Sequence, residues 1–167
     1  VQEQTFFSGW RDVLETVPQR YRERIKNVLR YVEENEMSAF CLREHEWKQI
    51  HGNYCPDNVS IGYESVFSRQ PACVAGLDCE QTVLWDPAFD IANFIAHVRF
   101  QFWKDQVVCE DIGLDRLTKR WAQGISVDLD DSLRQRIRFF TIRANLGIMR
   151  EMITESANPA TSEFKWL

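Results

Sequence analysis

The spacing of apolar residues divides this 167-residue chain into three parts and constrains its fold more than any other feature. Near both ends, apolar side chains recur every three or four residues, which is the spacing of an amphipathic helix. From about residue 38 to residue 80 that spacing disappears, and short apolar runs typical of strands replace it. We therefore predict one mainly helical α+β domain, spanning residues 1–167, with a small β segment in its middle.

The elements expected before residue 80 are two helices and three short strands. Pro18 separates the two helices and fits the first turn of the second, where a backbone N–H is not needed. The predicted helices cover residues 6–17 and 19–35. The predicted strands cover residues 39–42, 58–61 and 72–75. Because the polar stretch 62–71 joins the last two strands, we expect them to pair as a hairpin.

Helical spacing returns after Asp86-Pro87, a strong helix start in which Asp caps the helix and Pro occupies its first turn. The apolar stripe of this helix consists of Ile91, Phe94, Ile95, Val98 and Phe102. A shorter helix with Leu114, Leu117 and Trp121 is expected to end at Gly124. A last, long helix follows several candidate N-caps in Asp128–Ser132. We expect it to bury Leu133, Ile137, Phe140, Ala144, Ile148 and Met152.

Charge and hydropathy limit the partners that such a chain can have. The net charge is −5, whereas a nucleic-acid-binding domain carries a basic footprint, so we expect no nucleic acid partner. No apolar run approaches the length that crosses a bilayer, so we expect no membrane association. Five cysteines are an odd number without a disulfide-like rhythm, which favours a reduced, cytoplasmic location.

A zinc site is one alternative use of the cysteines. Cys41 and His45 are four residues apart, as are His51 and Cys55. Tetrahedral zinc sites usually have more closely spaced cysteine pairs, so buried thiols are the simpler interpretation.

The polar loop from His51 to Asn58 carries the residues best suited to chemistry. Phosphoryl transfer to a hydroxyl needs a group that orients the hydroxyl proton, oxygen ligands for magnesium and donors for the phosphates. A polar residue at a turn and an Asn five residues later can face one point, as Asn53 and Asn58 do. An acidic residue at the end of a nearby strand, here Asp78, can complete a magnesium site.

These residues also resemble a known family. Three motifs carry the resemblance, in the family's order: His51-Gly52-Asn53-x4-Asn58, Gly76-Leu77-Asp78-x-Glu80 and Asp86-Pro87-Ala88-Phe89-Asp90. They look like the C-terminal lobe of the aminoglycoside phosphotransferase and choline kinase-like group, which has a protein-kinase-like fold. By motif the resemblance covers roughly residues 36–105, and it implies that the β-hairpin carries the catalytic and metal loops.

The resemblance implies a role for each site residue. Asn58 would bind Mg²⁺ through its amide oxygen, and Asp78 would be the main metal carboxylate, facing the phosphates of ATP. Position 53 would face the substrate hydroxyl as the base. His51 and Asp90 are expected to support the loop rather than react.

Two departures from the family pattern limit the expected activity. Position 53 is Asn instead of Asp, and a neutral amide cannot accept a proton near pH 7, so we predict impaired catalysis. No Gly-rich phosphate loop or Val-Ala-x-Lys-like strand is present in the sequence. We therefore expect the nucleotide-binding N-terminal lobe to lie outside this chain.

Three hypotheses for function remain open at this stage. The first is an ATP-dependent phosphotransferase acting on a small-molecule hydroxyl. The second is a pseudokinase that serves as a binding or regulatory module, and the third is a helical structural domain whose motifs are accidental. The acidic residues Glu110, Asp111, Asp115 and Asp128 would suit a cationic acceptor, although an exposed acidic surface is the simpler interpretation.

Overall fold

The structure is a computed structural model, and it describes residues 2–39, 46–65, 67–105 and 114–155. It is a mainly helical α+β fold, as the sequence predicts. The described helices are α1 (Gln2–Thr16), α2 (Gln19–Ala39), α3 (Ala88–Lys104), α4 (Leu114–Gly124) and α5 (Asp131–Glu155). The described strands are β1 (Lys48–Ile50), β2 (Val59–Gly62), β3 (Cys73–Gly76) and β4 (Val83–Trp85). The chain forms two compact units, 1–41 with 142–167 and 42–141.

The first unit contains α1, α2 and the second part of α5. Its buried apolar residues are Trp10, Val17, Ile25, Leu29, Val32, Leu146, Ile148, Met149 and Ile153. Arg22 fixes the turn between α1 and α2, because its guanidinium donates to the carbonyl oxygens of Val17 and Glu15, both at 2.7 Å. These bonds satisfy carbonyls that the end of α1 leaves unpaired.

The second unit contains the strands, α3, α4 and the beginning of α5. Its core is built mainly from α3 and α5, and the predicted stripes contribute Ile91, Ile95, Leu133, Ile137 and Phe140. The other stripe residues Phe94, Val98 and Phe102 are half-buried, as are Ala144 and Met152, which were expected to be buried and belong to the first unit. The buried apolar residues are Ile50, Cys55, Ala88, Ile91, Ala92, Ile95, Ala96, Ala122, Leu133, Ile137, Phe139 and Phe140. Phe89 of α3 packs edge-on against Phe140 of α5, with ring centroids 5.6 Å apart.

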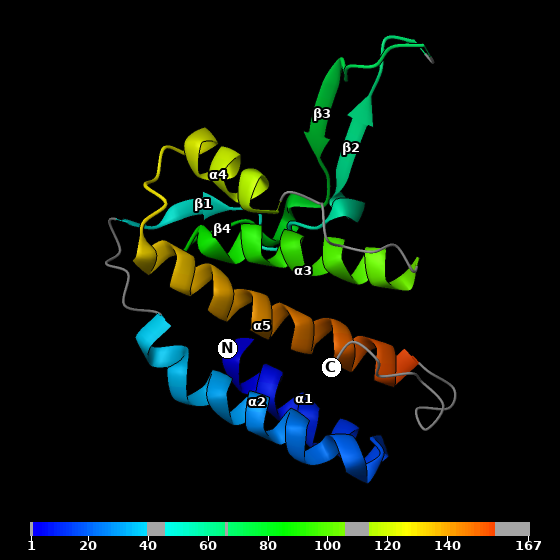
Figure 1. Cartoon of the computed structure of the whole chain (residues 1–167), viewed down its shortest axis with the longest axis vertical. Helices are drawn as coiled ribbons and strands as arrows, with labels where there is room; N and C mark the ends of the chain where they lie inside the picture. Colours follow the sequence, from blue (N-terminus) through cyan, green and yellow to red (C-terminus); the bar gives the residue numbers. More distant parts are fainter. Residues whose placement is uncertain (1, 40–45, 66, 106–113, 156–167) are drawn as a thin grey trace. The chain divides into compact units, whose positions relative to one another are not determined.

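Each sheet of the second unit has two antiparallel strands. The predicted hairpin is confirmed with a shift of one residue: β2 pairs with β3, and Ile61 lies opposite Val74. Figure 1 shows this hairpin extending away from α3 and from the sheet of β1 and β4. The strand predicted over 39–42 is wrong at its first residue, because α2 continues through Ala39, and residues 40–42 lie outside the described part.

The pairing of β1 with β4 was not predicted from the sequence. Each strand has three residues, and Lys48 lies opposite Trp85. Three residues are too few to show the alternation of apolar and polar side chains that identifies a strand. Trp47 packs against Trp85 with ring centroids 5.3 Å apart, so an aromatic contact accompanies the short ladder.

The start of α3 combines a cap with a buried ion pair. Asp86 Oδ1 accepts a hydrogen bond from the backbone N–H of Ala88 at 2.9 Å, as expected for a capping Asp. Asp86 Oδ2 lies 2.8 Å from Arg136 Nε of α5, in an ion pair whose two atoms do not align as a hydrogen bond. The Asp86 side chain is only 3% exposed, so this contact joins α3 and α5 inside the unit.

Candidate active site

The loop that follows β1 makes a tight turn at Gly52. This residue has a φ of +81°, and a Cβ placed on it would overlap the backbone carbonyl oxygen of Gln81. Only glycine adopts such a backbone without strain and also allows this close approach. Gly52 therefore permits the loop to lie directly against the turn that follows Asp78.

Asp90, in the first turn of α3, anchors the same loop. Its two carboxylate oxygens accept hydrogen bonds from the backbone N–H groups of His51 at 2.7 Å and Gly52 at 3.0 Å. Burial raises the pKa of Asp90, while these two bonds oppose the rise by favouring the charged form. The carboxylate thus fixes the position at which the loop leaves β1.

His51 connects the loop to the segment after β3. Its Nε2 lies 2.7 Å from the carbonyl oxygen of Leu77, and its Nδ1 lies 3.4 Å from the backbone nitrogen of Asn53. One neutral tautomer satisfies both contacts, with Nε2–H donating and Nδ1 accepting. Both ring nitrogens are then occupied by backbone groups, which is the arrangement of a histidine that positions a loop.

Asn53, Asn58 and Asp78 lie together at the base of the hairpin. Asn58 Nδ2 donates to the backbone carbonyl oxygen of Asn53 at 2.9 Å. The amide nitrogen of Asn53 lies 3.5 Å from Oδ2 of Asp78. A backbone bond from Leu77 N–H to the Asn58 carbonyl oxygen, at 2.8 Å, holds the two strand ends side by side. Residues 25 positions apart are thereby brought to one point.

Asp78 has a backbone conformation that is rare for residues other than glycine. Its φ of 57° and ψ of 53° are left-handed, and it directly precedes the turn Cys79–Gln81. Asn and Asp tolerate this region better than most residues, and such conformations concentrate at functional sites. The side chain is exposed, so its carboxylate can reach a ligand.

The donor set fits a hard cation such as Mg²⁺. Asp78 supplies a carboxylate. The amide nitrogen of Asn58 donates to the Asn53 carbonyl oxygen, so the amide oxygen of Asn58 is the atom that could bind a cation. Magnesium prefers oxygen ligands, takes one or two carboxylates and retains several waters. No group of three or more His, Cys, Asp or Glu side chains that could hold a metal is found among the described residues. Any cation here would therefore depend on the amide oxygen and on its own waters or phosphates.

The alternative zinc ligands are only partly within the described structure. Cys41 and His45 lie outside it, while His51 contacts two backbone groups and Cys55 is buried. Cys79 was not singled out as a site residue, yet its Sγ lies 3.9 Å from His51 Nε2. Nothing in the sequence alone pointed to this contact, because it depends on how the segment after β3 packs against His51.

Of the acidic residues expected to favour a cationic acceptor, only two lie within the described structure, Asp115 and Asp128. Glu110 and Asp111 lie outside the described residues, and Asp128 is exposed. Asp115 lies 2.6 Å from Lys119 Nζ and 3.5 Å from Arg134 Nη1. Two cations thus already neutralise Asp115.

Comparisons with protein-family models, with curated proteins and with solved structures gave no match. Among the described residues, no helix is both long enough and apolar enough to cross a bilayer.

Proposed function

We propose that this chain carries the metal-binding half of a phosphotransferase site, of the aminoglycoside phosphotransferase type, that acts on a small-molecule hydroxyl. One observation carries the proposal: Asn53, Asn58 and Asp78 lie together, in the order and spacing of the motifs they belong to. Mg²⁺ would be held by Asp78 and Asn58, and when bound it would neutralise the charge of the ATP phosphates.

Each residue then has a defined task. Asp90 and His51 hold the loop, so that Asn53 is fixed at its turn. Asn53 can hydrogen-bond an acceptor hydroxyl but cannot remove its proton, because the amide is neutral. A positioned base contributes about 10²–10⁴-fold to such a reaction, so we expect transfer as the chain stands to be slower by that factor.

The hairpin supports the proposal that a nucleotide-binding lobe outside this chain covers the site. Val59, Ile61 and Val74 share one face of β2 and β3, and Ile61 and Val74 are 51% and 63% exposed. Neither strand contains a charged residue or a proline, the usual protections of exposed strand edges. A covering lobe would bury this apolar face and bring the Gly-rich phosphate loop that is not present in this sequence.

A pseudokinase is the second candidate, and one contact favours it. The Asn53 amide places a hydrogen-bond donor beside Asp78, where an Asp at position 53 would place a second negative charge. The loop can therefore stay assembled without a cation. In this alternative the site binds a nucleotide or partner and performs no transfer.

A transfer assay separates the two candidates. The natural protein that carries this sequence is incubated with Mg²⁺, γ-labelled ATP and a panel of small hydroxyl compounds, as wild type and as Asn53→Asp. The phosphotransferase proposal expects turnover of Asn53→Asp to exceed that of wild type by about 10²–10⁴-fold, and Asp78→Asn added to it to abolish the gain. If Asn53→Asp binds Mg²⁺ and ATP but transfers nothing, the enzyme proposal is wrong and the pseudokinase remains.

A further inference from the structure

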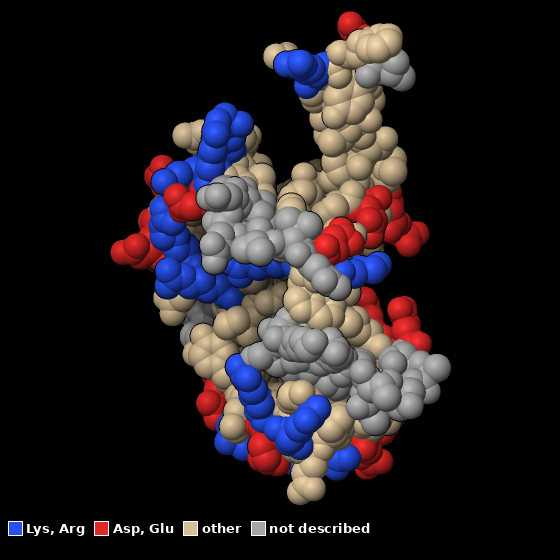
Figure 2. Space-filling model, turned by 45° about the vertical axis from the view of Figure 1, so that its right-hand side comes forward, with Lys and Arg blue, Asp and Glu red and all other residues tan. Residues whose placement is uncertain are grey.

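A concentration of positive charge on α4 and the first turns of α5 is independent of the proposed site. We call it the basic surface, and it consists of Arg116, Lys119, Arg120, Arg134 and Arg138. In Figure 2, Lys and Arg side chains gather on the left of the view, at the height of α4 and the beginning of α5. The whole chain carries a net charge of −5, so this surface differs in sign from the protein as a whole.

The charges are arranged in a way that does not favour stability. Arg116 and Arg120 are four residues apart on α4, and so are Arg134 and Arg138 on α5. Like charges at this spacing lie on the same helix face and slightly destabilise a helix. α4 and α5 therefore each carry one such like-charge pair at a small cost in helix stability.

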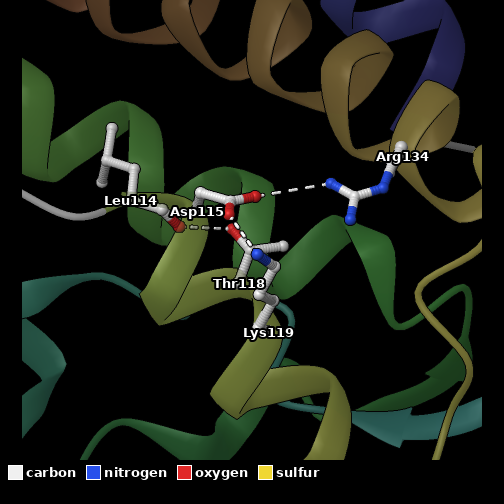
Figure 3. Close-up of polar contacts among 5 residues, drawn as sticks. All are labelled: Leu114, Asp115, Thr118, Lys119 and Arg134. Carbon is white, nitrogen blue, oxygen red and sulfur yellow. Dashed lines mark hydrogen bonds and ion pairs between the residues drawn. The ribbon is translucent and has the colours of Figure 1, made fainter.

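Asp115 shows which ligand chemistry this surface accepts. Its carboxylate lies between two members of the surface, with Lys119 Nζ 2.6 Å from one oxygen and Arg134 Nη1 3.5 Å from the other (Figure 3). These cations lower the pKa of Asp115, the hydrogen bond from Lys119 first. Thr118, one residue before Lys119, turns its hydroxyl to the carbonyl oxygen of Leu114 at 2.7 Å and does not contact the carboxylate (Figure 3).

After this contact the basic surface keeps an excess of positive charge. The stretch 114–138 carries six Lys and Arg side chains and four Asp side chains, which are Asp115, Asp128, Asp130 and Asp131. Arg116, Arg120 and Arg138 are exposed, and no ion pair involves them among the described residues. Their guanidinium groups can each bind a carboxylate through two parallel hydrogen bonds.

We propose that the basic surface is a docking site for an acidic segment of a partner protein, rich in Asp and Glu. The carboxylates of that segment bind Arg116, Arg120 and Arg138 as Asp115 binds Lys119 and Arg134. A protein segment fits better than nucleic acid or an anionic membrane, because the net charge of −5 repels an extended polyanion beyond the surface itself. Among the described residues of α4 and the first turns of α5, no aromatic side chain is exposed for bases to stack on, and Trp121 is half-buried.

The test uses a fluorescein-labelled peptide of alternating Glu and Ser and measures its fluorescence anisotropy with the full 167-residue chain. We expect binding at 50 mM salt that weakens by about tenfold or more at 300 mM salt, because surface charges are screened. Arg116→Glu combined with Arg120→Glu is expected to weaken binding at 50 mM salt at least tenfold. If circular dichroism shows that this variant is unfolded, Arg116→Gln with Arg120→Gln replaces it, with the same direction expected.

The matched control changes the same number of exposed arginines elsewhere, as Arg24→Glu with Arg30→Glu on α2. It is expected to leave peptide binding within about twofold of wild type, since it lies outside the basic surface. Equal weakening by both double variants, or no peptide binding at 50 mM salt, overturns the proposal. Tighter binding of a duplex DNA oligonucleotide or of phosphatidylserine vesicles than of the peptide also overturns it, in favour of the other class of partner.

Discussion

The side-chain amide nitrogen of Asn53 lies 3.5 Å from Oδ2 of Asp78, although 25 positions separate the two residues in the chain. This contact places a neutral donor beside the carboxylate that we propose as the main magnesium ligand. Both groups are reachable from solvent, so the bond itself contributes little to stability. Its importance is that it shows how close the loop after β1 lies to the end of β3 at the candidate site.

The first prediction concerns the charge at position 53. Asn53→Asp places a second carboxylate next to Asp78, which should lower the free energy of unfolding without Mg²⁺ by about 1 kcal/mol at low salt. Mg²⁺ should stabilise this variant more than wild type, since a ligand at ten times its Kd adds about 1.4 kcal/mol. Thermal unfolding with 0 and 10 mM MgCl₂ measures both effects.

The control for this experiment is Asn53→Asp combined with Asp78→Asn, which has one carboxylate at the site, as wild type does. Its Mg²⁺-dependent shift should be smaller than that of Asn53→Asp alone. Equal Mg²⁺ shifts in all three proteins would show that the ion acts elsewhere on this acidic chain.

The second prediction compares two glycines. Gly52→Ala forces a side chain into a left-handed turn against the Gln81 carbonyl, and we expect it to cost about 2–3 kcal/mol of stability. Gly124→Ala is the matched control, because a Cβ placed there meets no atom within 4 Å among the described residues beyond its chain neighbours and its own helix backbone. Urea unfolding should find the control within about 0.5 kcal/mol of wild type or slightly more stable. Similar losses at both positions would contradict the close approach at Gly52.

The third prediction concerns the buried ion pair between Asp86 and Arg136. Arg136→Met leaves the Asp86 carboxylate buried without its cation, and we expect a loss of about 3–5 kcal/mol at pH 7. Burial already raises the pKa of Asp86, and removal of Arg136 raises it further. A raised pKa in the folded protein makes stability fall as pH rises from about 4 through that pKa. The loss should therefore be smaller at pH 5 than at pH 7.

Asp86→Asn with Arg136→Met is the control for the pH effect, because it keeps an oxygen that can accept the Ala88 N–H and removes the titrating group. Chemical unfolding at pH 5 and pH 7 should show that the loss of unfolding free energy in this double variant does not grow from pH 5 to pH 7. A deficit of Arg136→Met that is the same at both pH values would contradict the proposed burial of charge.

The fourth prediction tests the apolar face of the hairpin. Ile61→Thr with Val74→Thr keeps two β-branched residues at opposite positions, so stability should change by less than about 0.5–1 kcal/mol. In the natural protein that carries this sequence, the pair of substitutions should weaken Mg²⁺-ATP binding, measured calorimetrically, if a nucleotide lobe covers this face. Unchanged nucleotide binding would show that no nucleotide lobe covers this face of the hairpin.

Most of the helices could be predicted from the sequence, because their apolar residues recur at helical spacing over long stretches. Capping residues, proline and glycine also mark where these helices begin and end. Asp130 Oδ1 caps α5 by accepting from the Leu133 N–H at 2.7 Å, within the predicted capping region, and α4 ends at Gly124 as expected. The end of α2 and the sheet of β1 and β4 were missed. β1 and β4 have three residues each, and their pairing is accompanied by a contact distant in sequence, that of Trp47 with Trp85.

The sequence also predicted that Asn53, Asn58 and Asp78 lie close together, and contacts join Asn58 to Asn53 and Asn53 to Asp78. That these residues form a magnesium site stays a prediction. The sequence could not reveal that Gln81 lies against Gly52, or that Asp115 is neutralised by Lys119 and Arg134. Such contacts depend on how turns and helices pack, which single-residue preferences do not encode.

The most direct measurement is paramagnetic broadening by Mn²⁺, which binds oxygen ligands as Mg²⁺ does. In ¹⁵N-labelled protein, substoichiometric Mn²⁺ should broaden the amide signals of Asn53, Asn58 and Asp78 first, and excess Mg²⁺ should restore them. Asp78→Asn, which suits the same left-handed backbone, should abolish the effect. If the three signals stay sharp, or broaden equally in Asp78→Asn, these residues do not share a cation and the account of this site is wrong.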